Sequence, residues 1–278
     1  LMRILLTNDD GVLSPVLRRS AEALAARHDV VVAAPSEDQS GKSHAFTHGP
    51  DRLLTHRLDT SNPWPLYSVD GTPADCVKLA VAHLMREHAP DLVVSGPNLG
   101  ENAGISAIYS GTVAAAREAA LWGIPGLAVS LNAVGHTDDG RPEWPLEFAL
   151  DWLLALLDAP DLLPAPGAYW NVNFPAAPPS AVAGARFTRM STVMFRDTYE
   201  EAVTRHGITG HRLLGHKPEE LFEPGTDDDA LRHGHIAVTP LRVSQGDDAA
   251  LESLRARTNL PDALAFPAVP AVTPGAPA

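Results

Sequence analysis

The stretch Arg3-Ile4-Leu5-Leu6-Thr7-Asn8-Asp9-Asp10-Gly11 joins a short apolar run to an amide, two adjacent carboxylates and a glycine. The apolar run predicts a buried strand over 3–6, with a loop at its carboxyl end. Asn, Asp and Gly are also common where a strand ends in a solvated turn. Adjacent carboxylates repel each other, however, and a divalent cation with oxygen ligands relieves that repulsion. The rest of the chain decides between a turn and a metal site.

Strands and helices alternate after this first strand. Ser14-Pro15 and Thr72-Pro73 each place a capping residue before a proline, which is typical of a helix start. The apolar patterns predict strands at 29–34, 66–69, 91–95, 126–130 and 170–174, and helices at 14–27, 72–88, 110–122 and 144–157. Such alternation predicts an α/β fold with a mostly parallel sheet and crossover helices.

The regular alternation of predicted strands and helices ends near residue 176. We expect a catalytic core over 1–175 and a β-rich C-terminal extension over 176–260, with hairpins and a returning strand at 235–239. Extensions of this kind often serve a partner subunit, so oligomerisation through it is an expectation. Residues 261–278 are rich in Pro and Ala and are expected to form a loosely held tail.

Composition excludes several classes of protein. A chain of 278 residues with one cysteine, Cys76, has no internal disulfide framework or Cys-based zinc site, and suits the cytoplasm. The net charge of −13 argues against binding of a nucleic-acid polymer through its phosphates. No apolar run approaches the roughly 20 residues of a membrane span, so no membrane association is expected.

Polar groups follow three of the predicted strands: Asn8-Asp9-Asp10, Ser40-Gly41 and Asn98. Because loops after parallel strands meet at one sheet edge, these groups are expected to converge there. Carboxylates together with neutral hydroxyl and amide oxygens suit magnesium or manganese better than zinc. We therefore predict a site for one divalent ion, Mg²⁺ or Mn²⁺, with Asp9, Asp10, Ser40 and Asn98 as ligands.

Ser110-Gly111-Thr112 opens a predicted helix and offers free N–H groups, two hydroxyls and the positive end of the helix dipole. This pattern is typical of a phosphate cradle, and it is also typical of an ordinary N-cap at Ser110. Beside a metal site the phosphate interpretation gains weight, because a phosphoryl group bridged by a metal needs donors for its other oxygens.

Other motifs narrow the chemistry. No GxGxxG follows the first strand, and neither GxxxxGK[ST] nor GxSxG occurs, which disfavours a dehydrogenase, a P-loop enzyme and an α/β-hydrolase. His44 and His48 are candidates for an acid or base, although exposed loop histidines are common. His233 and His235 are weak evidence for a second metal. We interpret the acidic run 226–229 as a solvated turn.

These residues resemble the SurE (stationary-phase survival protein) family of 5′/3′-nucleotidases, over most of the chain to about Leu241. The shared motifs are Ile4-Leu5-Leu6-Thr7-Asn8-Asp9-Asp10-Gly11, Ala34-Pro35 with Ser40-Gly41, Gly71-Thr72-Pro73-Ala74-Asp75-Cys76-Val77, Asp91-Leu92-Val93-Val94-Ser95-Gly96, Asn98 with Gly100 and Asn102, and Tyr109-Ser110-Gly111-Thr112-Val113. The resemblance implies a Rossmann-like three-layer core, a C-terminal extension used in homodimers or homotetramers, and metal-dependent hydrolysis of nucleoside monophosphates.

Carried over residue by residue, the resemblance implies metal-ligand roles for Asp9, Asp10, Ser40 and Asn98, and catalytic roles for Asp9, Asp10 and Asn98. It places Asn8, Gly41, Ser110, Gly111 and Thr112 near the phosphate. Among the departures from the family pattern are Pro97, where the family usually has Ile, and Glu101, where it commonly has Ala. Glu101 is expected to add negative charge near the site.

The sequence therefore predicts a 5′/3′-nucleotidase, with exopolyphosphatase activity as a further option. Two alternatives stay open: a phosphatase for another small phosphate, such as a sugar phosphate, and a non-catalytic nucleotide-binding sensor. The sequence also leaves open the base, the phosphate position, whether water or Asp10 is the nucleophile, and the choice between dimer and tetramer.

Overall fold

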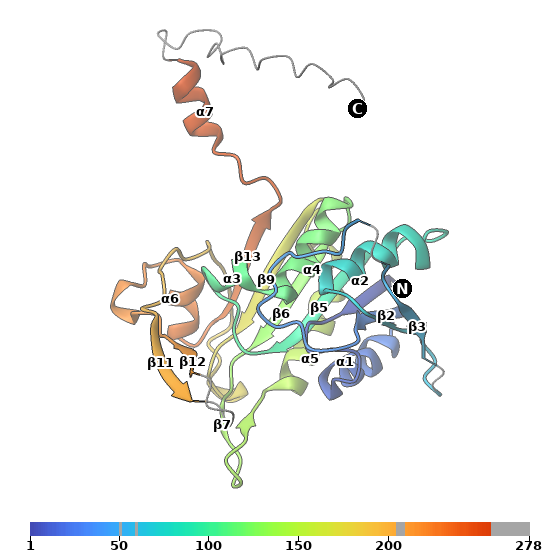
Figure 1. Cartoon of the computed structure of the whole chain (residues 1–278), viewed down its shortest axis with the longest axis horizontal. Coiled ribbons are helices and arrows are strands. Elements are labelled where there is room, and N and C mark those ends of the chain that lie inside the picture. Colours follow the sequence, from blue (N-terminus) through green and yellow to red (C-terminus); the bar gives the residue numbers. More distant parts are fainter. Residues whose placement is uncertain (50–51, 59–60, 204–208, 257–278) are drawn as a thin grey trace, which may run out of the picture. The chain divides into compact units, whose positions relative to one another are not determined.

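A computed structural model describes residues 1–49, 52–58, 61–203 and 209–256. Its centre is a nine-stranded sheet (Figure 1). The strands run, in spatial order, β10 (Ala185–Phe187), β13 (Ile236–Arg242), β9 (Ala168–Phe174), β6 (Gly126–Leu131), β5 (Leu92–Leu99), β1 (Arg3–Thr7), β2 (Asp29–Pro35), β4 (Leu66–Val69) and β3 (Thr55–Arg57).

Most neighbouring strands in this sheet are parallel. β1 pairs in parallel with β2 and β5, and β5–β6, β6–β9, β2–β4 and β10–β13 are parallel as well. Only β3 against β4 and β13 against β9 run antiparallel within the sheet. The predicted α/β class with a mostly parallel sheet is confirmed.

Helices cover both faces of the sheet and make three layers (Figure 1). Along β1, Ile4 and Leu6 face α1 (Pro15–Ala25) and α5 (Leu146–Leu157), while Leu5 faces α2 (Pro73–Leu79) and α4 (Gly111–Leu121). This alternation follows from the two-residue period of a strand. Burial on both faces explains why the three central residues, Ile4, Leu5 and Leu6, are all apolar, as in other buried parallel strands.

Helix α2 starts as the sequence indicates but ends earlier. Thr72 and Asp75 form a reciprocal capping box, and Pro73 occupies the first helical position. A π-helical turn, η1 (Ala80–Leu84), follows α2 directly, so regular α-helix does not continue to the predicted end near His88.

The loop expected directly after Ser95 is instead a continuation of β5 to Leu99. Ser95 pairs with Ala128 of β6, the register then shifts, and pairing resumes between Asn98 and Ser130. A bulge of this kind re-aims the side chains that follow it. The irregular Gly96-Pro97 step therefore interrupts the pairing without ending the strand.

The remaining elements include a hairpin and several short pieces. Strands β11 (Thr198–Val203) and β12 (Thr209–Leu214) pair antiparallel, and every described residue of β11 is exposed. The others are α3 (Ser106–Tyr109), α6 (Asp227–Arg232), β7 (Gly135–His136), β8 (Pro142–Glu143), η2 (Pro160–Leu162), η3 (Pro179–Ala181) and η4 (Glu219–Leu221). Within the described residues, no helix is long and apolar enough to cross a membrane.

The chain forms two compact units, Leu1–Val243 and Ser244–Ala278. The first contains the sheet and the hairpin, and β13 is the predicted returning strand. In the second, Asp247 caps α7 (Asp248–Arg255). The expected Pro- and Ala-rich tail over 261–278 lies outside the described residues, and the division at residues 175 and 260 stays a prediction.

Candidate active site

A cavity of about 680 Å³ opens at the carboxyl edge of β1, β2 and β5. Its polar part comes from the loops after these strands and from the start of α4, as expected for an open parallel sheet. The lining residues are Asp9, Asp10, Ser40, Gly41, Asn98, Leu99, Asn102, Ser106, Tyr109, Ser110, Met194, Phe195, Asp197, Leu213 and Gly215.

Asp9 is held against the start of α4. Thr112 donates its hydroxyl to Asp9 Oδ1 at 2.7 Å and its backbone N–H to Oδ2 at 3.2 Å. A Cβ at Gly111 would lie 3.1 Å from the Asp9 Cβ, so glycine allows this close approach. Burial raises the pKa of Asp9, and the hydrogen bonds from Thr112 partly offset that rise.

Asp10 lies beside Asp9, and no Lys or Arg among the described residues forms an ion pair with it. Burial raises its pKa to about 6, with further contributions from the negative charges of Asp9 and Asp38. Its Oδ2 atom is buried, and no described residue hydrogen-bonds to it. Two neighbouring carboxylates with an unsatisfied oxygen fit a divalent cation, because the cation would satisfy that oxygen and relieve the repulsion.

The loop after β2 brings Ser40 to the same cavity. Asp38 Oδ1 accepts from the Ser40 backbone N–H at 2.8 Å and from its hydroxyl at 2.6 Å. These bonds lower the pKa of Asp38. Gln39 also donates its N–H to the backbone oxygen of Asp9 at 2.8 Å. This last contact ties the Ser40 loop to the carboxylate pair.

Asn98 enters the cavity from β5, just beyond the bulge. Its Nδ2 donates to the Gly100 backbone oxygen at 2.8 Å, which fixes the amide through its nitrogen and leaves the oxygen for a ligand role. No cluster of three or more His, Cys, Asp or Glu that could hold a metal occurs in the described parts of the chain. The candidate set consists instead of two carboxylates, a hydroxyl and an amide.

Of the five residues predicted to contact phosphate, two line the cavity and three lie behind its lining. Gly41 and Ser110 line the cavity, and Ser110 is also the N-cap of α4, accepting from the Val113 N–H at 3.1 Å. Asn8 and Thr112 are buried behind it, where Asn8 Nδ2 donates to the Gly11 oxygen at 3.0 Å and Thr112 holds Asp9. Gly111 packs on Asp9 as well. A phosphate role for these five residues remains a prediction.

Neither His44 nor His48 is part of the cavity lining. His44 is engaged with Glu118 and Arg117 of α4, and the exposed His48 ring packs edge-on against Phe46 at 6.0 Å between centroids. The side chain of His233 pairs with Asp229.

The outer wall of the cavity comes from residues that the sequence did not single out. Met194, Phe195 and Asp197 precede β11, while Leu213 and Gly215 come from β12 and the residue after it. Tyr109, Met194 and Leu213 are each about half exposed. We call this mostly apolar wall, which also contains Asp197, the outer end of the cavity, and the oxygen-rich loops with the start of α4 its inner end. Exposed aromatic and apolar residues near a hairpin carried no specific signal in the sequence.

The acidic run 226–229 is not a solvated turn, so that prediction is wrong. Thr226 caps α6, and the fully buried Asp227 accepts from the N–H groups of Gly104 at 2.7 Å and Ser191 at 2.8 Å. Asp228 pairs with Lys217 at 2.8 Å. The run is acidic because it satisfies buried donors rather than because it meets solvent.

Glu101 faces a second cavity, of about 500 Å³, rather than the first. Asn132 Nδ2 donates to Glu101 Oε2 at 3.1 Å, and Lys217 Nζ lies 3.5 Å from Oε1. These contacts partly neutralise the charge that this residue was expected to add near the site.

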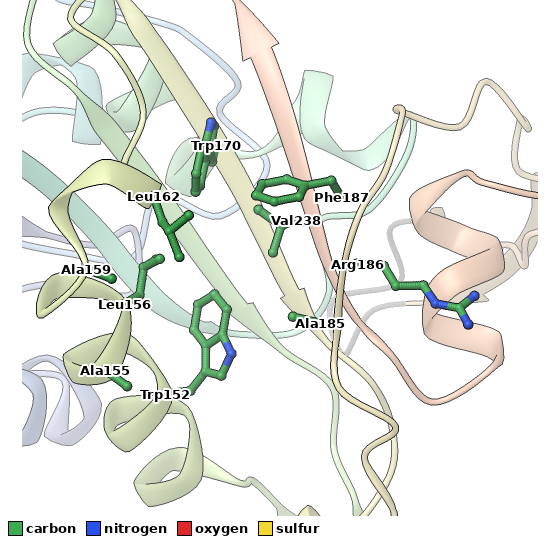
Figure 2. A pocket seen from close by; sticks show the side chains of 10 residues that line it. All are labelled: Trp152, Ala155, Leu156, Ala159, Leu162, Trp170, Ala185, Arg186, Phe187 and Val238. Atoms are coloured by element: carbon green, nitrogen blue, oxygen red, sulfur yellow. The ribbon is translucent and has the colours of Figure 1, made fainter.

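A third cavity, of about 310 Å³, lies between α5, β9, β10 and β13 (Figure 2). Trp152, Trp170 and Phe187 form much of its wall, and the Arg186 guanidinium extends away from them in Figure 2. Its lining contains no carboxylate and no hydroxyl. The oxygen-rich cavity is therefore the candidate active site.

Comparison with known proteins indicates the same family as the sequence motifs. The family model "Survival protein SurE" matches residues 4–197. The 5′-nucleotidase SurE of Solidesulfovibrio magneticus is 40% identical over 93% of this chain and 98% of its own length. The 5′-nucleotidase SurE 1 of Thermus thermophilus is 41% identical over 91% of this chain and 96% of its own.

A solved structure supports the assignment. The SurE protein from Aquifex aeolicus superimposes with a TM-score of 0.75 at 32% identity, covering 91% of this chain and 98% of that one. The fold, the motifs and the relatives thus agree over most of the chain, which belongs to the SurE family.

Proposed function

We propose that this protein is a divalent-metal-dependent nucleotidase that removes phosphate from nucleoside 5′- and 3′-monophosphates. The observation that carries the proposal is the uncompensated Asp9-Asp10 pair at the inner end of a cavity that also holds Ser40, Asn98 and the start of α4. The relatives named 5′-nucleotidase SurE support the choice of substrate.

Asp9, Asp10, Ser40 and Asn98 would hold one Mg²⁺ or Mn²⁺ ion. When bound, such an ion polarises a phosphoryl oxygen and lowers the pKa of a water molecule. Thr112 keeps the Asp9 carboxylate oriented through its two hydrogen bonds. The Asp38 and Gln39 contacts keep the Ser40 loop beside the carboxylates.

Donors on the chain would hold the remaining phosphoryl oxygens. The hydroxyl of Ser110 and the backbone N–H groups near Gly41 border the cavity, and the positive end of the α4 dipole favours an anion there. Fixed donors of this kind stabilise the charge that develops in the transition state. Local groups of this kind offset the repulsion that a chain of net charge −13 exerts on a phosphate substrate.

The apolar outer end of the cavity favours a nucleotide over a sugar phosphate. Tyr109, Met194 and Phe195 offer flat and apolar contact surface, which suits a base and gives nothing to a hydroxylated sugar alone. We therefore expect nucleoside monophosphates to be hydrolysed faster than sugar phosphates.

We further propose that the protein acts in the cytoplasm as a homodimer or homotetramer. The single, buried free thiol of Cys76 suits a reducing compartment. The hairpin of β11 and β12 exposes Tyr199, Val203 and Leu213, and exposed apolar patches commonly mark an interface. Size-exclusion chromatography with light scattering tests this point, and a monomer at micromolar concentration would contradict it.

The decisive experiment measures phosphate release from 5′- and 3′-nucleoside monophosphates, a sugar phosphate and short polyphosphate, with Mg²⁺ or Mn²⁺ and with chelator. The proposal predicts metal-dependent release that is fastest from nucleotides. Nucleotide binding without any release would indicate a sensor instead. Equal rates for sugar phosphate and nucleotides would indicate a general small-phosphate phosphatase.

A further inference from the structure

Helix α4 carries a buried carboxylate that the proposed reaction does not use. Glu118 is 2% exposed and accepts hydrogen bonds from His44 Nε2 at 2.8 Å, Lys78 Nζ at 2.7 Å and Trp122 Nε1 at 2.8 Å. A buried carboxylate with three side-chain donors is costly to assemble, because each partner must leave water and lose side-chain freedom. We expect such a cluster to hold its partner residues, and the segments that carry them, in a defined position.

His44 bridges two neighbouring residues of α4. Arg117 Nε donates to His44 Nδ1 at 2.8 Å, and since a guanidinium can only donate, Nδ1 is the acceptor in this contact. The Nε2 atom therefore carries the proton that is donated to Glu118. Both ring nitrogens are used, and the orientation of the imidazole is fixed from both sides.

His44 belongs to the loop that carries Ser40 and Gly41. This loop also contacts the end of α3, where the Ser43 N–H donates to the Tyr109 oxygen at 2.9 Å and the Ser43 hydroxyl donates to the Ile108 oxygen at 2.7 Å. Farther along, the Thr47 N–H donates to Asp75 at 2.8 Å, at the start of α2. Ser40 and Gly41 themselves are exposed, so their position depends on these anchors together with the contacts of Asp38 and Gln39.

The same helix thus holds both halves of the candidate metal site. Thr112, in the first turn of α4, fixes Asp9, and Arg117 and Glu118, further along it, fix His44. We propose that His44 is a positioning residue: by bridging Arg117 and Glu118 it sets the Ser40 loop against Asp9 and Asp10, so that one cation can be held by all of them. This inference rests on the proposed metal-dependent function.

The test compares three variants. His44→Ala removes both hydrogen bonds. His44→Gln retains a donor and an acceptor on one planar amide, which imitates the neutral imidazole at Nε2. The control is His48→Ala, which removes the same side-chain type from the same loop, where the ring is exposed.

Mn²⁺ affinity is measured by calorimetry, and the exchange rate of the Ser43 amide hydrogen is measured by NMR in metal-free protein. Loss of a residue that orients a metal ligand typically weakens metal binding by roughly 10- to 100-fold. We expect such a loss, with faster Ser43 exchange, in His44→Ala, substantial recovery in His44→Gln, and wild-type behaviour in His48→Ala. Nucleotide turnover at saturating Mn²⁺ should fall less than the affinity does.

A lowered melting temperature in His44→Ala with an unchanged Mn²⁺ dissociation constant would overturn the inference, because His44 would then only brace the fold. If His44→Ala does not fold, the comparison of His44→Gln with His48→Ala decides, and weaker Mn²⁺ binding in His48→Ala than in His44→Gln would overturn it. Wild-type protein that neither binds Mn²⁺ nor releases phosphate would instead overturn the proposed function, and this inference with it.

Discussion

Two pairs of adjacent aspartates, of which Asp9, Asp227 and Asp228 are buried and Asp10 is half-buried, differ in how their charge is balanced. Asp227 accepts from backbone N–H groups of Gly104 and Ser191, and Asp228 pairs with Lys217, a lysine whose side chain is only 5% exposed. Asp9 also has donors. Asp10 and Asp228 each have one buried oxygen without a hydrogen-bond partner, and burial raises the pKa of Asp10 and of Asp227, so the two pairs differ in the cationic partner that Lys217 gives to Asp228. Among the described residues, no Lys or Arg forms an ion pair with Asp9 or Asp10.

The difference shows that the role of an acidic dipeptide depends on the residues that surround it. The pair at 227–228 has a cationic partner within the chain, Lys217, although Asp228 Oδ2 has no hydrogen-bond partner among the described residues. Asp227 joins α6 to the loop that follows β5. The pair at 9–10 has no cationic partner among the described residues, and it borders the oxygen-rich cavity of about 680 Å³. Removal of the cationic partner should strongly lower the stability of a protein that contains a structural pair. A functional pair should instead respond mainly to an added cation.

The largest expected effect is on activity, from Asp10→Asn. This change keeps the size of the side chain but removes one of the two charges that would hold the cation. Metal-dependent phosphate release should fall on the order of 100-fold or more, as expected when a metal ligand is altered. Steady-state assays at saturating Mn²⁺ measure this, and a variant with wild-type turnover would show that the pair is not the catalytic metal site.

The next effect is on stability, from Lys217→Met. Asp228 would be left as a buried charge without its partner, which typically costs about 3–5 kcal/mol in the free energy of unfolding. Urea titration measures the loss, and the double variant Lys217→Met with Asp228→Asn should recover part of it. A loss below about 1 kcal/mol would remove the contrast between the two pairs.

A further buried carboxylate, Glu118, should affect the stability of the protein at acid pH. Burial raises its pKa, but hydrogen bonds from His44, Lys78 and Trp122 outweigh burial and bring the value from 4.5 to about 2. Because the folded value lies below the unfolded one, the stabilisation is complete above pH 4.5 and is lost as the pH falls towards about 2. Denaturant unfolding across this window should show wild type losing up to about 3 kcal/mol more than Glu118→Gln. Parallel losses in the two proteins would contradict the assignment.

The smallest expected effect concerns Thr112→Val, which deletes the hydroxyl that donates to Asp9 while the backbone N–H contact remains. We expect Mn²⁺ affinity to fall roughly 10-fold, at the lower end of the range for residues that orient a ligand. Thr188→Val is the matched control, since Thr188 pairs with Thr239 outside the cavity lining. Equal Mn²⁺ affinities in the two variants would mean that the Thr112 hydroxyl does not help to position Asp9.

The sequence predicted the inner end of the site because that end depends on topology alone. Once strands 3–6, 29–34 and 91–95 are parallel neighbours, Asp9, Ser40 and Asn98 must reach the same edge of the sheet. The outer wall could not be predicted in this way. Met194 and Leu213 reach the cavity through the fold of an extension whose short strands carry no periodic signal.

Two buried networks were also beyond the sequence. Glu118 meets His44 and Lys78 from 74 and 40 residues away, and charged residues on an Ala-rich helix are usually solvated. Asp227 and Asp228 are buried only because the donors of Gly104, Ser191 and Lys217 come to them. In both networks the burial of a charge was decided by partners distant in the sequence, which local patterns do not reveal.

The most direct test of the contrast between the two pairs is a calorimetric titration of Mn²⁺ into wild-type protein, Asp10→Asn, and the double variant Lys217→Met with Asp228→Asn. We predict one site per chain in the wild type, loss of that site in Asp10→Asn, and its retention in the double variant. Undiminished binding by Asp10→Asn, or binding lost only from the folded double variant, would contradict the account.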